Sequence, residues 1–227
     1  MTTGGSTSFF GVRRMDLLIA IYIFCIAAAE LMGAKTFPLL EWPFRLNASV
    51  AIFTVPLIFS INDIIVEVYG PQRARSVVRS GLFVIVLLLL YALLTTALPP
   101  STRFASSEAA YDAIFTFSIR MSIASLAAFA ISQFFDVYLF SRIRQALGTS
   151  KLWLRNNVSN ILAQFVDTVV FIVLAFYSFA TPLGENAAFL WSIILPYWML
   201  KNVMSALVTP LVYLGVRWLK RDPEYNG

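Results

Sequence analysis

The sequence predicts an all-α polytopic membrane protein with six transmembrane helices and with the N- and C-termini in the cytoplasm. The 227 residues are 59% hydrophobic and only 13% charged, and the mean hydropathy is +0.77. A soluble domain is closer to about half apolar and about a quarter charged. In addition, the apolar residues form long stretches, and most Lys and Arg residues lie in alternate connections between them.

Six segments are apolar over roughly the 20 residues that a helix needs to cross a bilayer. We expect spans at about 15–37, 47–69, 80–98, 114–141, 156–179 and 188–216. Pro99-Pro100 and the Thr-Pro-Leu-Gly stretch at 181–184 indicate turns between spans. The predicted organisation is a cytoplasmic tail at 1–12, a six-helix transmembrane domain at 13–221 and a second cytoplasmic tail at 222–227.

The distribution of positive charge orients these spans. Of the 17 Lys and Arg residues, twelve precede the first span, follow the second and fourth spans, or follow the sixth. The connections on the opposite side carry only Arg45 and Arg103. The positive-inside rule therefore places both termini in the cytoplasm. The same asymmetry explains the net charge of +5, so we expect no direct nucleic-acid partner.

The residues that are missing exclude several classes of chemistry. The chain has no histidine and one cysteine, Cys25, which excludes HExxH zinc sites, Ser-His-Asp triads and an intrachain disulfide. Neither a GxGxxG nor a GxxxxGK[ST] loop occurs, so nucleotide-driven work would need a partner chain. We expect no metal, no cofactor and no catalytic residue.

Carboxylates inside the apolar spans are the strongest candidates for functional residues. A charged group at the bilayer centre costs at least about 2.5–3.5 kcal/mol on insertion scales, so each is a functional hypothesis by default. Five occur within the spans or at their edges: Glu30, Asp63, Glu67, Asp136 and Asp167. Three cations lie within the spans as well: Lys35, Arg120 and Lys201.

The fourth and fifth spans repeat the pattern Q-F-x-D-x-x-x-F. It provides Gln133, Asp136 and Phe140 in one span and Gln164, Asp167 and Phe171 in the other. At about 1.5 Å of rise per residue, both glutamines lie roughly 13–14 Å from the nearest cytoplasmic arginine, near the midplane. Positions i, i+3 and i+7 share one helical face, so each span has a polar face. Lipid does not solvate a polar face. We predict that these six side chains face a shared interior site.

Other polar residues in the spans are second choices for the same site. Asn62, Asp63 and Glu67 lie near the cytoplasmic end of the second span, where Glu67 could instead form an interfacial ion pair. Lys201, near the middle of the sixth span, could bridge an aspartate or contact a ligand.

Two further charged residues have alternative explanations. For Glu30, a structural ion pair with a cation in the spans and a role on a transport pathway remain open. We expect Arg120 to snorkel or pack.

Three stretches resemble a known family. They read NDIIVEVYG at 62–70, RMSIASLAAFAISQFFDVYLF at 120–140 and LWLRNNVSNILAQFVDT at 152–168. The last stretch adds Asn157 to the candidate site residues. They resemble the queuosine precursor transporters of the vitamin uptake transporter group, over roughly residues 60–175. The resemblance implies six spans and uptake of 7-cyano-7-deazaguanine, or a related 7-deazaguanine, across a bacterial inner (plasma) membrane for tRNA queuosine salvage.

The implied ligand fits the predicted polar groups. A guanine-like base presents N–H donors at N1 and at the 2-amino group, which a carboxylate can accept, and an acceptor at O6, which an amide or a lysine can serve. Bases also stack on aromatic rings such as Phe140 and Phe171. The expected partners are this small molecule and the lipid bilayer. A homodimer remains open.

Two alternatives come from other classes of function. The chain could be the substrate-binding subunit of an ATP-driven vitamin importer, which would require separate ATPase and coupling subunits. It could also be an intramembrane aspartyl protease that uses Asp136 and Asp167, although the sequence contains no GxGD motif.

Overall fold

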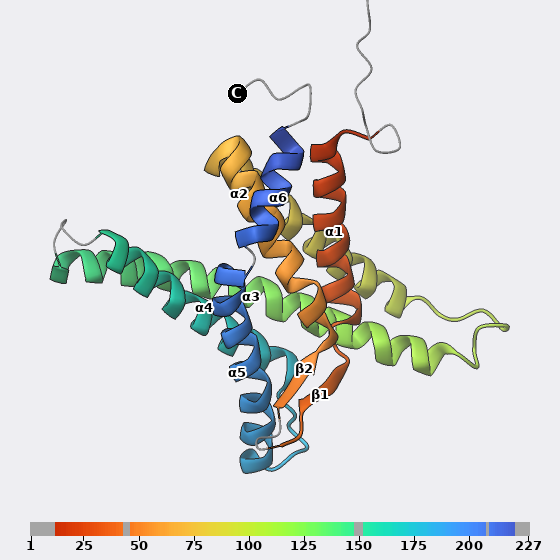
Figure 1. Cartoon of the computed structure of the whole chain (residues 1–227). Helices are drawn as coiled ribbons and strands as arrows, with labels where there is room; N and C mark the ends of the chain where they lie inside the picture. The colour runs from red at the N-terminus through yellow and green to blue at the C-terminus, as the bar shows by residue number, and fades with distance from the viewer. Residues whose placement is uncertain (1–11, 43–45, 148–151, 208, 221–227) are drawn as a thin grey trace, which may run out of the picture.

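The computed structural model describes residues 12–42, 46–147, 152–207 and 209–220, and helices dominate it (Figure 1). In chain order the elements are α1 (Arg14–Met32), β1 (Thr36–Leu40), β2 (Leu46–Ser49), the 3-10 helix η1 (Val50–Phe53), α2 (Val55–Ala97), α3 (Glu108–Leu147), α4 (Leu152–Phe176), α5 (Leu183–Leu207) and α6 (Thr209–Lys220). This mainly helical architecture agrees with the broad prediction from the sequence.

Several helices carry the apolar surface that a membrane requires. Within the described residues, three helical stretches are long and apolar enough to cross a bilayer: Arg14–Met32, Val50–Ala97 and Glu108–Phe135. A shorter apolar helix covers Ile161–Phe176. Large apolar side chains also point outward, including Phe83, which is 62% exposed, and Phe134, which is 80% exposed. Such a surface is suited to lipid and would be unusual on a soluble monomer.

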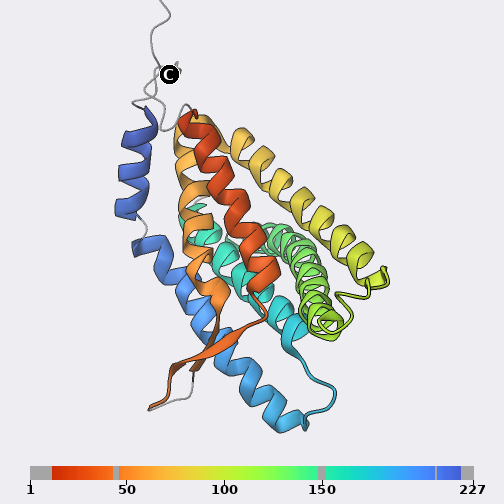
Figure 2. The same ribbon diagram turned by 90° about the vertical axis from the view of Figure 1, so that its right-hand side faces the viewer.

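The charged segment between the second and third predicted spans is itself helical rather than only a connection between them. Helix α2 runs through it and is interrupted at Gly70, where φ is 80° and ψ is 168°. Glycine tolerates this left-handed φ, and Pro71 can begin the next helical arm because its missing N–H is not needed there. The two arms of α2 meet at the end of the molecule where α1 begins and α6 ends, and they diverge from there (Figure 2).

A β-hairpin departs from the all-α prediction. The predicted spans at 15–37 and 47–69 are wrong at their facing ends, where Thr36 pairs with Ser49 in an antiparallel sheet of β1 and β2. Apolarity alone did not separate this hairpin from helix. Contacts with α5 hold it in place, because the Asn47 amide donates to Ser192 Oγ at 2.7 Å and the Tyr197 hydroxyl donates to the Ser49 carbonyl at 3.1 Å.

The last predicted span, 188–216, is divided into α5 and α6. Helix α6 packs against the first arm of α2, and their close approach depends on a glycine. A Cβ atom added at Gly215 would lie 2.3 Å from Ile64 Cδ1. At the same end of the molecule, the Arg14 guanidinium donates to the Trp218 carbonyl and lies 5.4 Å from the centre of its ring. The start of α1 and the end of α6 are therefore neighbours.

Helices α3 and α4 form a long antiparallel hairpin, and α3 crosses α1 in Figure 1. Arg120 of α3 reaches the end of α4, where its Nε donates to the Leu174 carbonyl at 2.8 Å and its Nη2 donates to the Tyr177 carbonyl at 2.5 Å. The last carbonyls of a helix lack intrahelical partners and favour a cation. Arg120 thus has a packing role, which accounts for one cation within the predicted spans.

Candidate functional site

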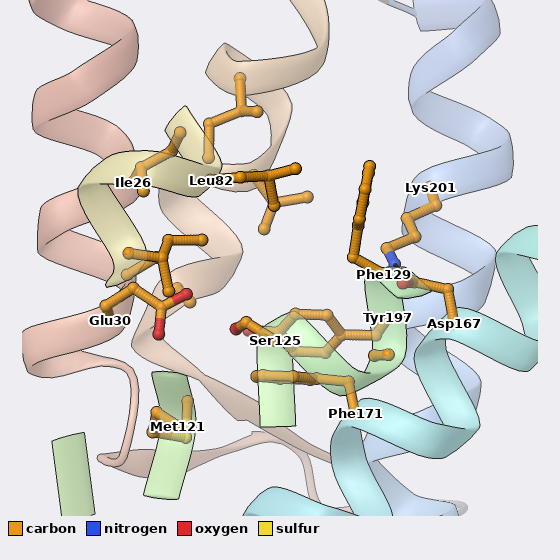
Figure 3. Close-up of a pocket in the computed structure, with 16 residues that line it drawn as sticks. Ile26, Glu30, Leu82, Met121, Ser125, Phe129, Asp167, Phe171, Tyr197 and Lys201 are labelled. Atoms are coloured by element: carbon orange, nitrogen blue, oxygen red, sulfur yellow. Dashed lines mark hydrogen bonds and ion pairs between the residues drawn. The ribbon is translucent and has the colours of Figure 1, made fainter. Parts of the chain in front are cut away.

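A cavity of about 240 Å³ lies where the helices converge (Figure 3). Its walls come from α1, η1, both arms of α2, α3, α4 and α5. Most of the lining is apolar, and the chemically distinctive side chains are Glu30, Ser125, Phe129, Asp167, Phe171, Tyr197 and Lys201. A mainly apolar cavity with a few convergent polar groups is the usual form of a small-molecule site.

An ion pair joins α4 and α5 on one wall of this cavity. Lys201 Nζ lies 2.7 Å from Asp167 Oδ2, and the two side chains are 12% and 31% exposed, respectively. The Ser132 hydroxyl has two acceptors within reach of its single proton, Asp167 Oδ1 at 3.4 Å and the Phe129 carbonyl at 3.1 Å. Pairing and hydrogen bonding lower the cost of holding both charges away from water. Of the two roles that the sequence left open for Lys201, the structure shows the bridge to Asp167.

Aromatic rings lie beside the ion pair. Phe171 is one helical turn beyond Asp167 on α4, and both line the cavity. Phe129 from α3 and Tyr197 from α5 line the same space (Figure 3). Their flat faces can pack against a planar ligand. The cavity therefore combines stacking surfaces with charged hydrogen-bonding groups.

A second cavity, of about 200 Å³, adjoins the first and shares Phe129, Asp167 and Lys201 with it. Gln133 of α3 and Gln164 of α4 both line this second cavity. The two glutamines of the repeated pattern thus face one space on the described chain, beside the Asp167–Lys201 pair. Their amides can each donate and accept hydrogen bonds.

A third cavity, of about 520 Å³, continues toward the kink in α2. It shares Phe129 and Gln133 with the second cavity and is also lined by Asn62, Arg75 and Arg79. The Asn62 side-chain oxygen is buried and has no hydrogen-bond partner among the described residues. The three cavities form a series that runs from the centre toward the kink in α2.

The other predicted site residues lie elsewhere or outside the described side chains. Asp63 and Glu67 are exposed on α2, and among the described lining residues they belong to none of these three cavities. Asp136 and Phe140 are on α3 and Asn157 is on α4, but their side chains lie outside the described part of the structure.

Sequence reasoning left several lining residues out of the predicted site. Ser125 and Phe129 precede Gln133 by eight and four residues on the same helix, so helical spacing already placed them on one face. Glu30 was left open between two roles, and no local pattern connected it to Asp167. Its place on the cavity wall depends on how α1 packs against α3.

Comparisons with known proteins agree with the resemblance found in the sequence. The profile of a family described as "Putative vitamin uptake transporter" matches residues 49–215. A "Probable queuosine precursor transporter" of Bacillus subtilis is 32% identical over 93% of this chain and 88% of its own length. No solved structure matches the chain.

Two further relatives are similar over shorter regions. A "Probable queuosine precursor transporter" of Haemophilus influenzae is 30% identical over 61% of this chain and 56% of its own length. A "Queuosine precursor transporter" of Escherichia coli is 29% identical over 55% of this chain and 53% of its own length. These relatives are transporters, which sets aside the intramembrane-protease alternative. The chain belongs to the vitamin uptake transporter family, a family of membrane transporters rather than enzymes.

Proposed function

We propose that this chain imports a queuosine precursor, 7-cyano-7-deazaguanine or a related 7-deazaguanine, across a bacterial inner membrane. The names of its three relatives support this substrate class. In the proposed topology the chain crosses the membrane six times with both termini in the cytoplasm. The two arms of α2 count as two spans, and α5 with α6 counts as one.

The central cavity is the observation that carries the proposal. Drug-sized ligands occupy pockets of about 300–1,000 Å³, so adjoining cavities of about 240 and 200 Å³ suit a bicyclic base. Phe129, Phe171 and Tyr197 supply stacking surfaces, while Asp167 and Lys201 supply polar contacts. The proposed substrate needs both kinds of contact.

Hydrogen bonds to the base extend into the second cavity. In the proposed site, Lys201 or an amide donates to O6, and Gln133 and Gln164 complete the contacts around the ring. Asp136, Phe140 and Asn157 remain proposed contacts on the strength of the sequence pattern alone. Asp63 and Glu67 remain second choices, and their exposed positions make direct contact with a ligand in these cavities less favourable.

The third cavity is the proposed exit toward the cytoplasm. It joins the second cavity through Phe129 and Gln133 and ends beside Arg75 and Arg79, which the positive-inside rule places on the cytoplasmic side. Alternating access would then open and close this route around a fixed site near the midplane. Conversion of the base inside the cell would keep net movement inward.

Reconstitution of the purified chain in liposomes tests the proposed function. Radiolabelled 7-cyano-7-deazaguanine should accumulate inside faster than in empty liposomes, and an excess of an unlabelled guanine-like base, but not of adenine, should compete. Asp167→Asn should abolish uptake because it removes the charge that holds Lys201 at the cavity wall. Glu185→Gln, a change at an exposed position on α5, is the matched control.

The same assay separates a carrier from a subunit of an ATP-driven importer. Uptake by the chain alone supports a secondary carrier or facilitator. Ligand binding without uptake, followed by uptake only after ATPase and coupling subunits are added, supports the subunit. Absence of both binding and uptake would overturn the proposed substrate.

A further inference from the structure

We propose that Glu30 is the carboxyl group that accepts the N–H donors of the bound base, and that the Asp167–Lys201 pair forms the opposite wall. This inference rests on the proposed function, because it names the residue that selects a guanine-type edge. The sequence pattern favoured Asp136 and Asp167 for that contact. The arrangement of charges around the central cavity favours Glu30.

Glu30 is buried without a counter-charge among the described residues. It is 6% exposed, and its Oε2 atom has no hydrogen-bond partner in the described part of the chain. Three nearby cations were candidates to neutralise it. Lys35 is exposed, Arg120 donates to the carbonyls at the end of α4, and Lys201 is bound to Asp167. The carboxyl group is therefore available to a ligand.

The side chain faces the cavity. Figure 3 shows Glu30 directed into the space from α1, across from Asp167 and Lys201, with Ser125 between Glu30 and the ion pair. The hydroxyl groups of Ser122 and Ser125 lie beside the carboxyl group. A hydroxyl can donate to a carboxyl oxygen and orient the group, and because each carboxylate oxygen has two lone pairs, both oxygens can still accept from the ligand.

The competing carboxylate already has its donors. Asp167 Oδ2 accepts from Lys201 at 2.7 Å, and Asp167 Oδ1 competes with the nearer Phe129 carbonyl for the single proton of the Ser132 hydroxyl. Donors of the base would have to share the Asp167 oxygens with the Lys201 ammonium group, which already neutralises this carboxylate. In contrast, a buried acceptor that lacks a partner gains its full hydrogen-bond energy when a ligand supplies the donor.

The guanine-type edge fits a single carboxylate. Its N1–H and 2-amino N–H groups point the same way and can bind the two oxygens of one carboxyl group as a bidentate pair. The O6 acceptor lies beside N1 and can be served by Lys201 or by an amide of the second cavity. The bicyclic ring would then lie among Phe129, Phe171 and Tyr197.

Removing one donor from the ligand gives a direct test. Binding of 7-cyano-7-deazaguanine and of the analogue without the 2-amino group, 7-cyano-7-deazahypoxanthine, would be measured by calorimetry on the full chain in detergent. We expect the wild type to prefer the guanine-type base by about 10-fold or more, because a site built for a donor rejects a ligand that lacks it. Glu30→Gln should reduce that preference to within about 3-fold, since the amide nitrogen cannot accept a donor.

Matched variants show which carboxyl group accepts the N1–H and 2-amino donors of the base. Asp167→Asn should weaken both ligands but keep the preference between them, and the exposed Glu185→Gln should behave as wild type. Glu30→Ala is a second variant with the same expected loss of preference, and size-exclusion chromatography checks that each variant is folded.

Three results would overturn the inference. A Glu30→Gln protein that weakens both ligands equally would make Glu30 structural. If only Asp167→Asn lost the preference for the guanine-type base, Asp167 would be the group that accepts its N–H donors, and the proposed function would stand. Failure of the wild type to bind either base would remove the proposed substrate, and this inference with it.

Discussion

Asp167 and Glu30 are both carboxylates on the wall of one cavity, and they have opposite surroundings. Asp167 on α4 is held by Lys201 of α5 at 2.7 Å and by the Ser132 hydroxyl. Glu30 on α1 is more deeply buried and has an oxygen without a partner among the described residues. An acidic residue in an apolar helix can therefore stabilise helix packing in one place and remain available for a ligand in another.

The difference has an energetic consequence. Removing one member of a buried ion pair leaves an uncompensated charge, which destabilises the fold. Neutralising a buried carboxylate that has no counter-charge relieves a cost, because a lone charge is poorly solvated inside the protein. Removing the charge of Lys201 should therefore destabilise the ligand-free protein, whereas removing the charge of Glu30 should not.

The largest effect is expected for Lys201→Met. It should lower the free energy of unfolding by about 2–3 kcal/mol, because Asp167 would lose its counter-charge while retaining some solvent contact. Thermal unfolding in detergent measures the change. Lys35→Met, at an exposed position, should change it by less than about 0.5 kcal/mol. If the two variants lost the same free energy of unfolding, the Asp167–Lys201 pair would add no stability beyond that of an exposed lysine.

A smaller effect is expected when both partners are neutralised. The double variant Asp167→Asn/Lys201→Met should be more stable than Lys201→Met alone by about 1–2 kcal/mol, since no unpaired charge remains. A double-mutant cycle of melting temperatures gives this coupling. Strict additivity of the two single changes would show that Asp167 and Lys201 do not stabilise the fold as a pair.

Glu30→Gln should have a still smaller effect on the ligand-free protein. The substitution keeps the size of the side chain and removes a buried charge, so stability should stay constant or rise by up to about 1 kcal/mol. The melting temperature without ligand is the measurement. A loss well above 1 kcal/mol would show that Glu30 has a stabilising partner in the fold.

The smallest effect is expected for Glu67→Gln. Glu67 is exposed on α2, and surface substitutions usually change stability by less than about 0.5 kcal/mol. Comparing its melting temperature with that of Glu30→Gln sharpens the contrast between exposed and buried carboxylates. A large destabilisation would place Glu67 in an essential contact. Uptake by the same variant tests its predicted place in the site.

Local sequence patterns predicted much of the candidate site. The spacing of Gln164, Asp167 and Phe171 placed them on one face of a helix, and that face borders the central and second cavities. This prediction was possible because helical periodicity acts over a few residues and lipid disfavours polar faces. The same reasoning applied to α3 accounts for Gln133 on the second cavity.

Long-range contacts were less predictable. The sequence offered several partners for each buried charge, and the choice of Lys201 for Asp167 joins residues 34 positions apart. The hairpin at 36–49 and the helical segment after Gly70 were also missed. Their conformations depend on contacts with α5 and on a single glycine with positive φ, which average hydropathy does not detect.

The sequence by itself determined that this chain is a helical membrane protein with polar residues at fixed positions on its helices. Composition and periodicity are enough for this, because the lipid penalty and the helical repeat act on every segment separately. Only the tertiary structure decided that Asp167 is paired and that Glu30 faces the same cavity with an oxygen free among the described residues. Those outcomes depend on which helices become neighbours, and Coulomb and hydrogen-bond energies select partners only once packing has brought them within reach.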